Sequence, residues 1–211
     1  MDSQNRIGLV DPSHPELSAF GLGTAAVFMI FFGFIWLGWG FSSSPAFTDF
    51  SSDRVLPAAR WICFYLAFLI FLAISIVAVV KARHRMKTLA IGPGEYRDRF
   101  SKPFRAICFF EGGGCAVAVA LALGFHRVDL LAAGISLVVG VHFVPLARLF
   151  RINAYFITAA AVIAVDLVCI FVFKGKQVTF LSASATGIIL WGTATYLMIL
   201  ERRLDREFKA S

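Results

Sequence analysis

Residues 129–147 read DLLAAGISLVVGVHFVPLA, a run of 19 residues in which Asp129 and His142 are the ionisable side chains. An α-helix rises about 1.5 Å per residue, so a run of this length nearly covers the roughly 30 Å of hydrocarbon in a bilayer. The rest of the chain has the same character, because 59% of its 211 residues are hydrophobic and 16% are charged. This composition predicts an integral membrane protein.

Five more apolar windows of similar length accompany this one. Backbone N–H and C=O groups in lipid must be satisfied within their own segment, so each window is predicted to be a helix. We therefore predict an all-α bundle in one domain, residues 1–211, with six transmembrane helices at about 19–40, 58–80, 105–125, 129–147, 154–173 and 178–200. The first window is longer than the core of a secretory signal and is expected to remain as a span.

Lys and Arg residues are distributed unevenly around these spans. Fifteen of the 20 gather on one side, eight of them between residues 81 and 105. Cytoplasmic loops carry this excess, so both termini are predicted to lie in the cytoplasm, with the chain in the cell's inner membrane.

The same clustering at helix ends accounts for the net charge of +7. It favours anionic lipid headgroups as partners and argues against binding to nucleic acid. A homo-oligomer, with a second copy of the chain as partner, is compatible with the sequence. The connection 81–104 is expected to be a polar loop with a turn at residues 91–94, and its basic residues hold topology or dock a partner.

Three ionisable side chains lie well inside the predicted spans: Glu111, His142 and Asp166. Each costs about 2.5–3.5 kcal/mol at the centre of a membrane helix, which makes it a candidate for function. Glu111 follows Arg105 by six residues and His142 precedes Arg148 by six, so both lie roughly 9 Å from the cytoplasmic ends of adjacent helices. At this shared depth His142 is expected to face Glu111.

A proline and a run of glycines are predicted to distort the helices that carry this pair. Pro145 has no N–H to donate to the carbonyl of Val141, so the helical turn beside His142 should open. Three consecutive glycines weaken a helix and let another backbone or a ligand come close. These are Gly112, Gly113 and Gly114.

Arg148 and Asp166 extend the candidate site in two directions. Arg148 is expected to reach the inner headgroups, or to snorkel towards a carboxylate as its electrostatic partner or as an anion contact. Asp166 lies about 10 Å from the outer end of its helix, at the level of Ser184 and Thr186 in the next helix. It is interpreted either as the outer station of a polar path or as one buried carboxyl group satisfied by neighbouring hydroxyls.

Small residues are interpreted as packing residues. Ala183 and Gly187 should let the last helix pack closely against the preceding one. One helix face is expected to contain Glu111, Cys115, Ala118 and Ala122. The four cysteines have no zinc-ligand spacing, so neither a metal site nor a cofactor is predicted; they are Cys63, Cys108, Cys115 and Cys169.

The residues around His142 carry a likeness to known sequences. The chain resembles a group of uncharacterised bacterial multi-pass membrane proteins with the pattern Gly-x-His-Phe-x-Pro-Leu-Ala-Arg-x-Phe, after a helix that carries Glu-Gly. The matching residues are Gly140, His142, Phe143, Pro145, Leu146, Ala147, Arg148 and Phe150, with Glu111 and Gly112 upstream. The likeness covers less than half of the chain. It implies that Glu111, His142 and Arg148 form one site, and it implies no substrate.

Three functions are compatible with these patterns. In the first, Glu111 and His142 bind or translocate a proton or a small solute in the cytoplasmic half of the membrane. In the second, the pair only holds helices together and the protein is a membrane scaffold or assembly factor. In the third, the protein is an intramembrane lipid-modifying enzyme with Glu111 or His142 as general base, although the sequence has no Gly-x-Ser-x-Gly or His-Glu-x-x-His motif and no phosphatase-like cluster of arginines and histidines.

Overall fold

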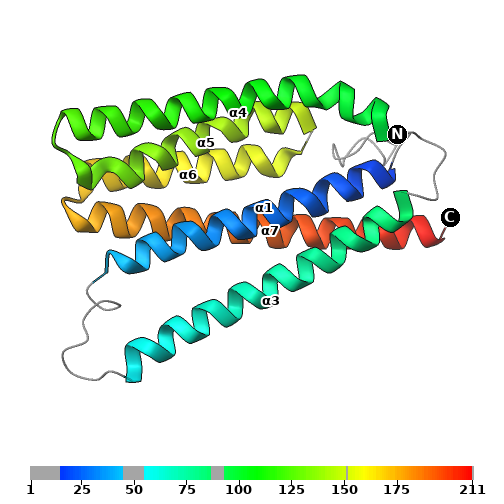
Figure 1. The fold of residues 1–211 in the computed structure, drawn as a ribbon, viewed down its shortest axis with the longest axis horizontal. Coiled ribbons are helices and arrows are strands. Elements are labelled where there is room, and N and C mark those ends of the chain that lie inside the picture. The colour runs from blue at the N-terminus through cyan, green and yellow to red at the C-terminus, as the bar shows by residue number, and fades with distance from the viewer. Residues whose placement is uncertain (1–14, 45–54, 87–92, 151, 211) are drawn as a thin grey trace, which may run out of the picture.

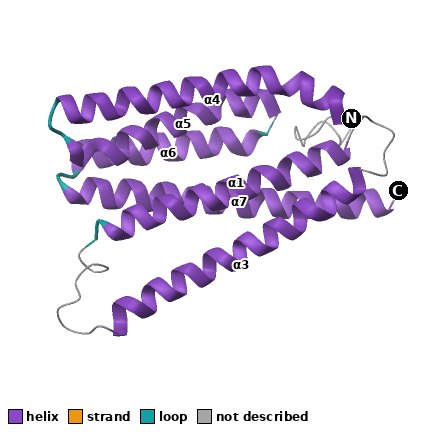
Figure 2. Ribbon diagram, in the orientation of Figure 1, coloured by secondary structure: helices purple, strands orange, loops and turns teal. Residues whose placement is uncertain are grey.

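The fold is described from a computed structural model, which covers residues 15–44, 55–86, 93–150 and 152–210. Six α-helices account for nearly all of these residues, with one short 3-10 turn at Val128–Leu130 (Figure 2). The helices are α1 (Pro15–Ser42), α3 (Val55–Met86), α4 (Pro93–Gly124), α5 (Leu131–Phe150), α6 (Asn153–Val172) and α7 (Lys176–Ala210). The all-α prediction is confirmed for the described part of the chain.

Five of these helices are long and apolar enough to cross a membrane. Their apolar windows are Ala25–Ser42, Lys102–Gly124, Val128–Phe150, Asn153–Val172 and Lys176–Arg203. Each overlaps a predicted span. The described apolar part of α3 is shorter, Ile62–Ile74, although the helix itself has 32 residues. The chain is therefore built as a multi-pass membrane protein.

The predicted polar loop at 81–104 is wrong in its extent. Helix α3 continues to Met86 and α4 already begins at Pro93, so most of this segment is helical. Proline is well accommodated in the first turn of a helix, which explains how Pro93 starts α4 where a turn was expected. Residues 87–92, including part of that predicted turn, lie outside the described residues.

Successive helices alternate in direction, and α1 begins at the end of the bundle where α7 ends (Figure 1). Helix α7 is central, because it packs against α1, α5 and α6. Helix α4 packs mainly against α5, and α3 mainly against α1, so these two lie at opposite edges of the bundle. The expected contacts between consecutive helices from α4 to α7 are all present.

The closest helix crossing joins α1 and α7. A Cβ atom added to Gly187 would lie 2.8 Å from the Gly33 carbonyl oxygen and 2.9 Å from the Leu37 nitrogen, so the two backbones nearly touch. Beside this crossing the Trp191 indole donates a hydrogen bond of 3.0 Å to the carbonyl of Ile30. The prediction that Gly187 packs against the preceding helix is wrong, because its close neighbours belong to α1.

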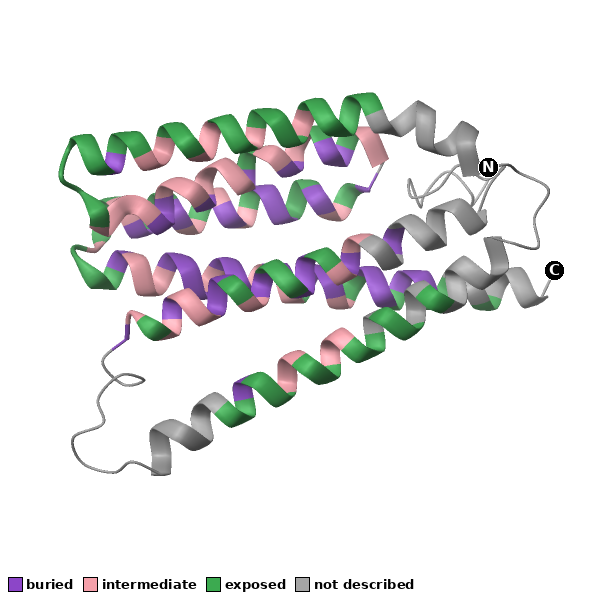
Figure 3. Ribbon diagram, in the orientation of Figure 1, coloured by how far each residue is buried: buried purple, intermediate pink, exposed green. Residues whose placement is uncertain are grey.

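The outer surface of the bundle is strongly apolar. Figure 3 shows that α3 and α4 are mostly exposed, whereas buried residues concentrate in α1, α5, α6 and α7. Phenylalanine side chains that point outward include Phe109 (78% exposed) and Phe171 (82% exposed). Exposed apolar area on this scale is suited to acyl chains rather than to water.

Candidate functional site

Helix α4 presents one narrow face to α5. The predicted face is confirmed, since Glu111, Cys115, Ala118 and Ala122 are partly or fully buried while Phe110 and Val117 point outward. Small side chains follow Glu111 along this face, so α5 can approach closely. Helix α4 therefore carries a single carboxylate into an otherwise apolar contact between two helices.

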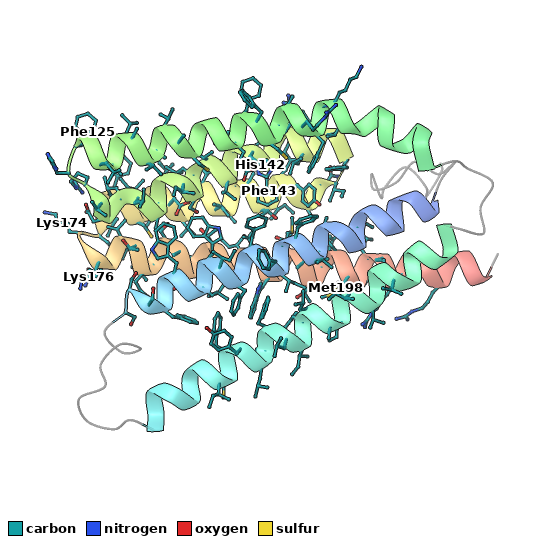
Figure 4. All side chains as sticks on the ribbon, viewed as in Figure 1. Phe125, His142, Phe143, Lys174, Lys176 and Met198 are labelled. Carbon is teal, nitrogen blue, oxygen red and sulfur yellow. The ribbon has the colours of Figure 1, made fainter. Side chains whose placement is uncertain are left out.

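His142 and Glu111 meet across this contact, as predicted from their depths. The distance from His142 Nε2 to Glu111 Oε2 is 3.5 Å. The side chains are 13% and 28% exposed, and Figure 4 shows His142 on the part of α5 that lies next to α4. This separation is longer than a typical N–H···O bond of about 2.9 Å but short enough for an ion pair. A proton on the imidazole would be stabilised by the carboxylate.

The second ring nitrogen of His142, Nδ1, lacks a well-formed hydrogen bond in the part of the chain that the structure describes. His142 Nδ1 is buried and makes no hydrogen bond within the described residues. A neutral imidazole needs one donor and one acceptor partner, and an imidazolium needs two acceptors. The Val139 backbone, one turn earlier in α5, lies near the imidazole, but no well-formed hydrogen bond joins it to Nδ1. This leaves capacity for a water or a polar ligand group at that atom.

The distortions expected around the pair are only partly present. Helix α5 continues through Pro145 to Phe150 without interruption, and α4 continues through its glycines. A Cβ atom added to Gly114 would lie 2.8 Å from Val138 Cγ1, so this glycine does permit close contact with α5. A Cβ atom added to Gly112 or Gly113 would have no described atom within 4 Å, so no described segment packs closely against these two glycines.

Arg148 does not join the pair. Its side chain is exposed in the last turn of α5, and no described carboxylate forms an ion pair with it. An exposed cation at a helix end is in position to interact with the headgroup region. The prediction that Arg148 snorkels towards a carboxylate therefore finds no support in the described residues.

Asp166 lies in a separate polar cluster where α5, α6 and α7 meet. Ser182 donates a hydrogen bond to Asp166 Oδ1, and the Ser136 hydroxyl lies close to the same carboxyl group. Ser136 and Thr186 share a hydrogen bond of 2.5 Å. All four side chains are 0% exposed. The expected contact with a hydroxyl is confirmed for Ser182.

Ser184 differs from the expectation, because it faces α1 rather than Asp166. A Cβ atom added to Gly40 of α1 would collide with its hydroxyl, which has no hydrogen-bond partner within the described residues. The sequence analysis also missed Ser136. A single serine in an apolar helix resembles a small packing residue, and its spacing from His142 gave no signal because the two side chains lie on different faces of α5.

The described residues contain no group of three or more His, Cys, Asp or Glu side chains that could hold a metal ion. All four cysteines are free thiols. Comparison with protein-family models, with curated proteins and with solved structures finds no match. The likeness of the His142 segment to a bacterial group thus stays a prediction, and function must be argued from the geometry.

Proposed function

We propose that this protein is a six-span protein of the inner membrane, with both termini in the cytoplasm, that binds or translocates a proton or a small solute at Glu111 and His142. The observation that carries the proposal is the 3.5 Å approach of the two side chains across the contact between α4 and α5. An ionisable residue in a membrane helix is expensive to insert, and two that meet can stabilise one shared proton. The predicted likeness to the uncharacterised bacterial group supports treating this segment as a site.

The chemistry of the pair suits reversible protonation. Histidine is the side chain whose charge ordinarily changes near neutral pH, and an adjacent carboxylate stabilises the charged ring. Glu111 retains 28% exposure, so its carboxylate is not sealed inside the contact between α4 and α5. His142 Nδ1 offers a second contact on the protein side of the ring.

Infrared pH titration of the purified protein tests proton binding directly. Because the chain has 13 Asp and Glu residues, the Glu111 band is isolated as the difference between wild type and Glu111→Gln, and it should shift in His142→Gln since each side chain sets the field around the other. Proton flux into proteoliposomes, measured with a trapped pH-sensitive dye, tests whether the bound proton crosses the membrane. For a translocating protein, the flux should fall in Glu111→Gln and in His142→Gln to the level of protein-free vesicles.

His126 provides the matched control. This histidine lies in the exposed turn after α4, with a φ of 54° that asparagine also tolerates. His126→Asn should leave both the carboxyl band and the flux unchanged. A Glu111 band that titrates identically in wild type and in His142→Gln would show that the two groups are independent and would refute the proposal.

One observation favours a second function, that of a membrane scaffold in which the pair is structural. The tight contact of Gly114 with Val138 places the pair beside a close helix crossing, where a polar contact contributes only about 1 kcal/mol of packing energy. Equal losses of thermal stability in Glu111→Gln and His142→Gln at every pH, without a change in the carboxyl band, would favour the scaffold.

A further inference from the structure

A line of hydroxyl groups runs along the inner face of α7. Its members, called here the hydroxyl stripe, are Thr179, Ser182, Thr186 and Thr193. Their spacing of three, four and seven residues places them on one helix face. Each bonds to a different part of the bundle. Thr179 donates to the Asp129 carbonyl at 3.1 Å, and Ser182 donates to Asp166. Thr186 bonds to Ser136 at 2.5 Å, and Thr193 bonds to Thr158 at 2.7 Å.

Asp166 of α6 lies beside the centre of the stripe, and no described cationic side chain accompanies its carboxyl group. Asp166 is 0% exposed, and no Lys, Arg or His among the described residues pairs with it. Its Oδ2 atom has no hydrogen-bond partner within the described part of the chain. A lone ionised carboxylate in an apolar interior is very costly, so a compensating cation would stabilise it strongly.

The surrounding atoms are suitable ligands for a hard cation. The carboxylate of Asp166 and the hydroxyls of Ser136, Ser182 and Thr186 supply only oxygen donors. A hydroxyl that donates its hydrogen to the carboxylate can still offer an oxygen lone pair to an ion. With one carboxylate in the cluster, a single positive charge neutralises the cluster, whereas a divalent ion would leave an excess charge buried.

The cluster is close to one end of the bundle. Ser136 is five residues from the start of α5, Asp166 six from the end of α6 and Ser182 six from the start of α7, so all three lie roughly 7–9 Å from that end. There Thr179 bonds to the backbone at Asp129, and the Arg127 guanidinium is neutralised by the Asp129 carboxylate at 3.0 and 3.1 Å. The exposed side chains of Lys174 and Lys176 lie at the same end of the bundle (Figure 4), whereas the cluster itself contains oxygen atoms and no cationic side chain among the described residues.

From these observations we infer that Asp166, Ser136, Ser182 and Thr186 form a binding site for a dehydrated alkali-metal cation such as sodium. This site is independent of the proposed function of Glu111 and His142, which lie on the contact between α4 and α5. The cation replaces the missing partner of Asp166 Oδ2 and holds α5, α6 and α7 together through their own oxygen atoms.

The test is the thermal stability of the purified full-length protein in sodium chloride and in choline chloride at equal ionic strength and fixed pH. Sodium should raise Tm saturably, by roughly 5 °C or more at a large excess over Kd, because it binds only the folded state. Asp166→Asn should remove the difference between the two salts, and Ser182→Ala should shift it to higher sodium concentrations.

Two variants separate this site from its surroundings. Ser184→Ala removes a buried hydroxyl from the same helix that faces Gly40 instead of Asp166, so the sodium effect should persist. Glu111→Gln should also keep the sodium effect, so the cation site and the proposed function can fail separately. If Asp166→Asn does not fold, sodium-23 NMR line broadening by wild type, reduced in Ser182→Ala, provides the same test.

Three outcomes would overturn the inference. The first is equal Tm in sodium and choline salts. The second is a Tm that depends on pH alone, which would mean that Asp166 carries only a proton. The third is a sodium effect that Asp166→Asn retains at full size.

Discussion

At the scale of single residues, polar side chains in this protein fall into two kinds. Some are hydrogen-bonded within the bundle, such as Thr158, whose hydroxyl bonds to Thr193 at 2.7 Å and to the Ala154 carbonyl at 2.9 Å. Others leave an atom unsatisfied, namely His142 Nδ1, Asp166 Oδ2 and Ser184 Oγ. The first kind stabilises the fold, and the second kind contains the candidates for binding a ligand.

The contact between Thr158 and Thr193 should contribute measurably to stability. Thr193→Val keeps the shape of the side chain but removes the hydrogen bond between α6 and α7, so unfolding free energy should fall by about 0.5–1.5 kcal/mol. Thr195→Val is the matched control, because that hydroxyl bonds only to the Trp191 carbonyl of its own helix among described atoms. Denaturation in mild detergent measures both. Equal effects would show that the interhelical bond adds nothing.

Sequence patterns at the residue scale predicted the contact between Glu111 and His142. The depth of each residue below the cytoplasmic end of its helix could be counted along the chain, and a short connection joins the two helices. The same counting placed Asp166 near hydroxyls in α7. It could not find Ser136, because a serine surrounded by apolar residues has no pattern of its own. It also could not show that Arg148 turns outward, since a long flexible side chain at a helix end has many accessible positions.

At the scale of helices, apolar length and short connections predicted which segments are helical and that consecutive helices from α4 to α7 touch, but not the close contact between α1 and α7. Helices α1, α4, α5 and α7 each have a glycine at a close contact, and several neighbours can fit such a small-residue face. Gly187 illustrates this, because its close neighbours Gly33 and Leu37 lie in α1, about 150 positions earlier in the chain. The end of α3 and the start of α4 were misplaced for a different reason. Charged residues permit helix outside the membrane as readily as loop, so the hydropathy pattern ends before the helix does.

Close packing of α1 and α7 should depend on Gly187. Gly187→Ala inserts a methyl group against backbone atoms of Gly33 and Leu37, which must separate, so stability should fall by about 1–3 kcal/mol. Gly192→Ala in the same helix is the control. Its Cβ meets nothing within 4 Å, and alanine favours helix over glycine, so stability should be unchanged or rise by up to about 1 kcal/mol. Similar losses in both variants would contradict the tight crossing.

At the scale of the whole molecule, charge and hydropathy act together. The apolar exterior requires a membrane, and the basic residues decide which end faces the cytoplasm. Lys174 and Lys176 lie at the end of the bundle that also contains Phe125, as Figure 4 shows, whereas Arg202, Arg203 and Arg206 follow the apolar part of α7 towards the opposite end. In the proposed topology, the end with Lys174 and Lys176 is accessible from outside an intact cell, and the end with Arg206 is not.

Single-cysteine labelling tests that topology. In a background where the four native cysteines are replaced by alanine, Lys174→Cys should react with a membrane-impermeant maleimide on intact cells, because its side chain is exposed at the outer end. Arg206→Cys, also exposed, should react only after the membrane is permeabilised. Ile188→Cys serves as the control, since it is 62% exposed on the protein but lies near the middle of the apolar window Lys176–Arg203, where acyl chains are expected and a thiol does not ionise readily. Labelling of Arg206→Cys but not of Lys174→Cys on intact cells would reverse the orientation, and labelling of both would mean that α7 does not cross the membrane.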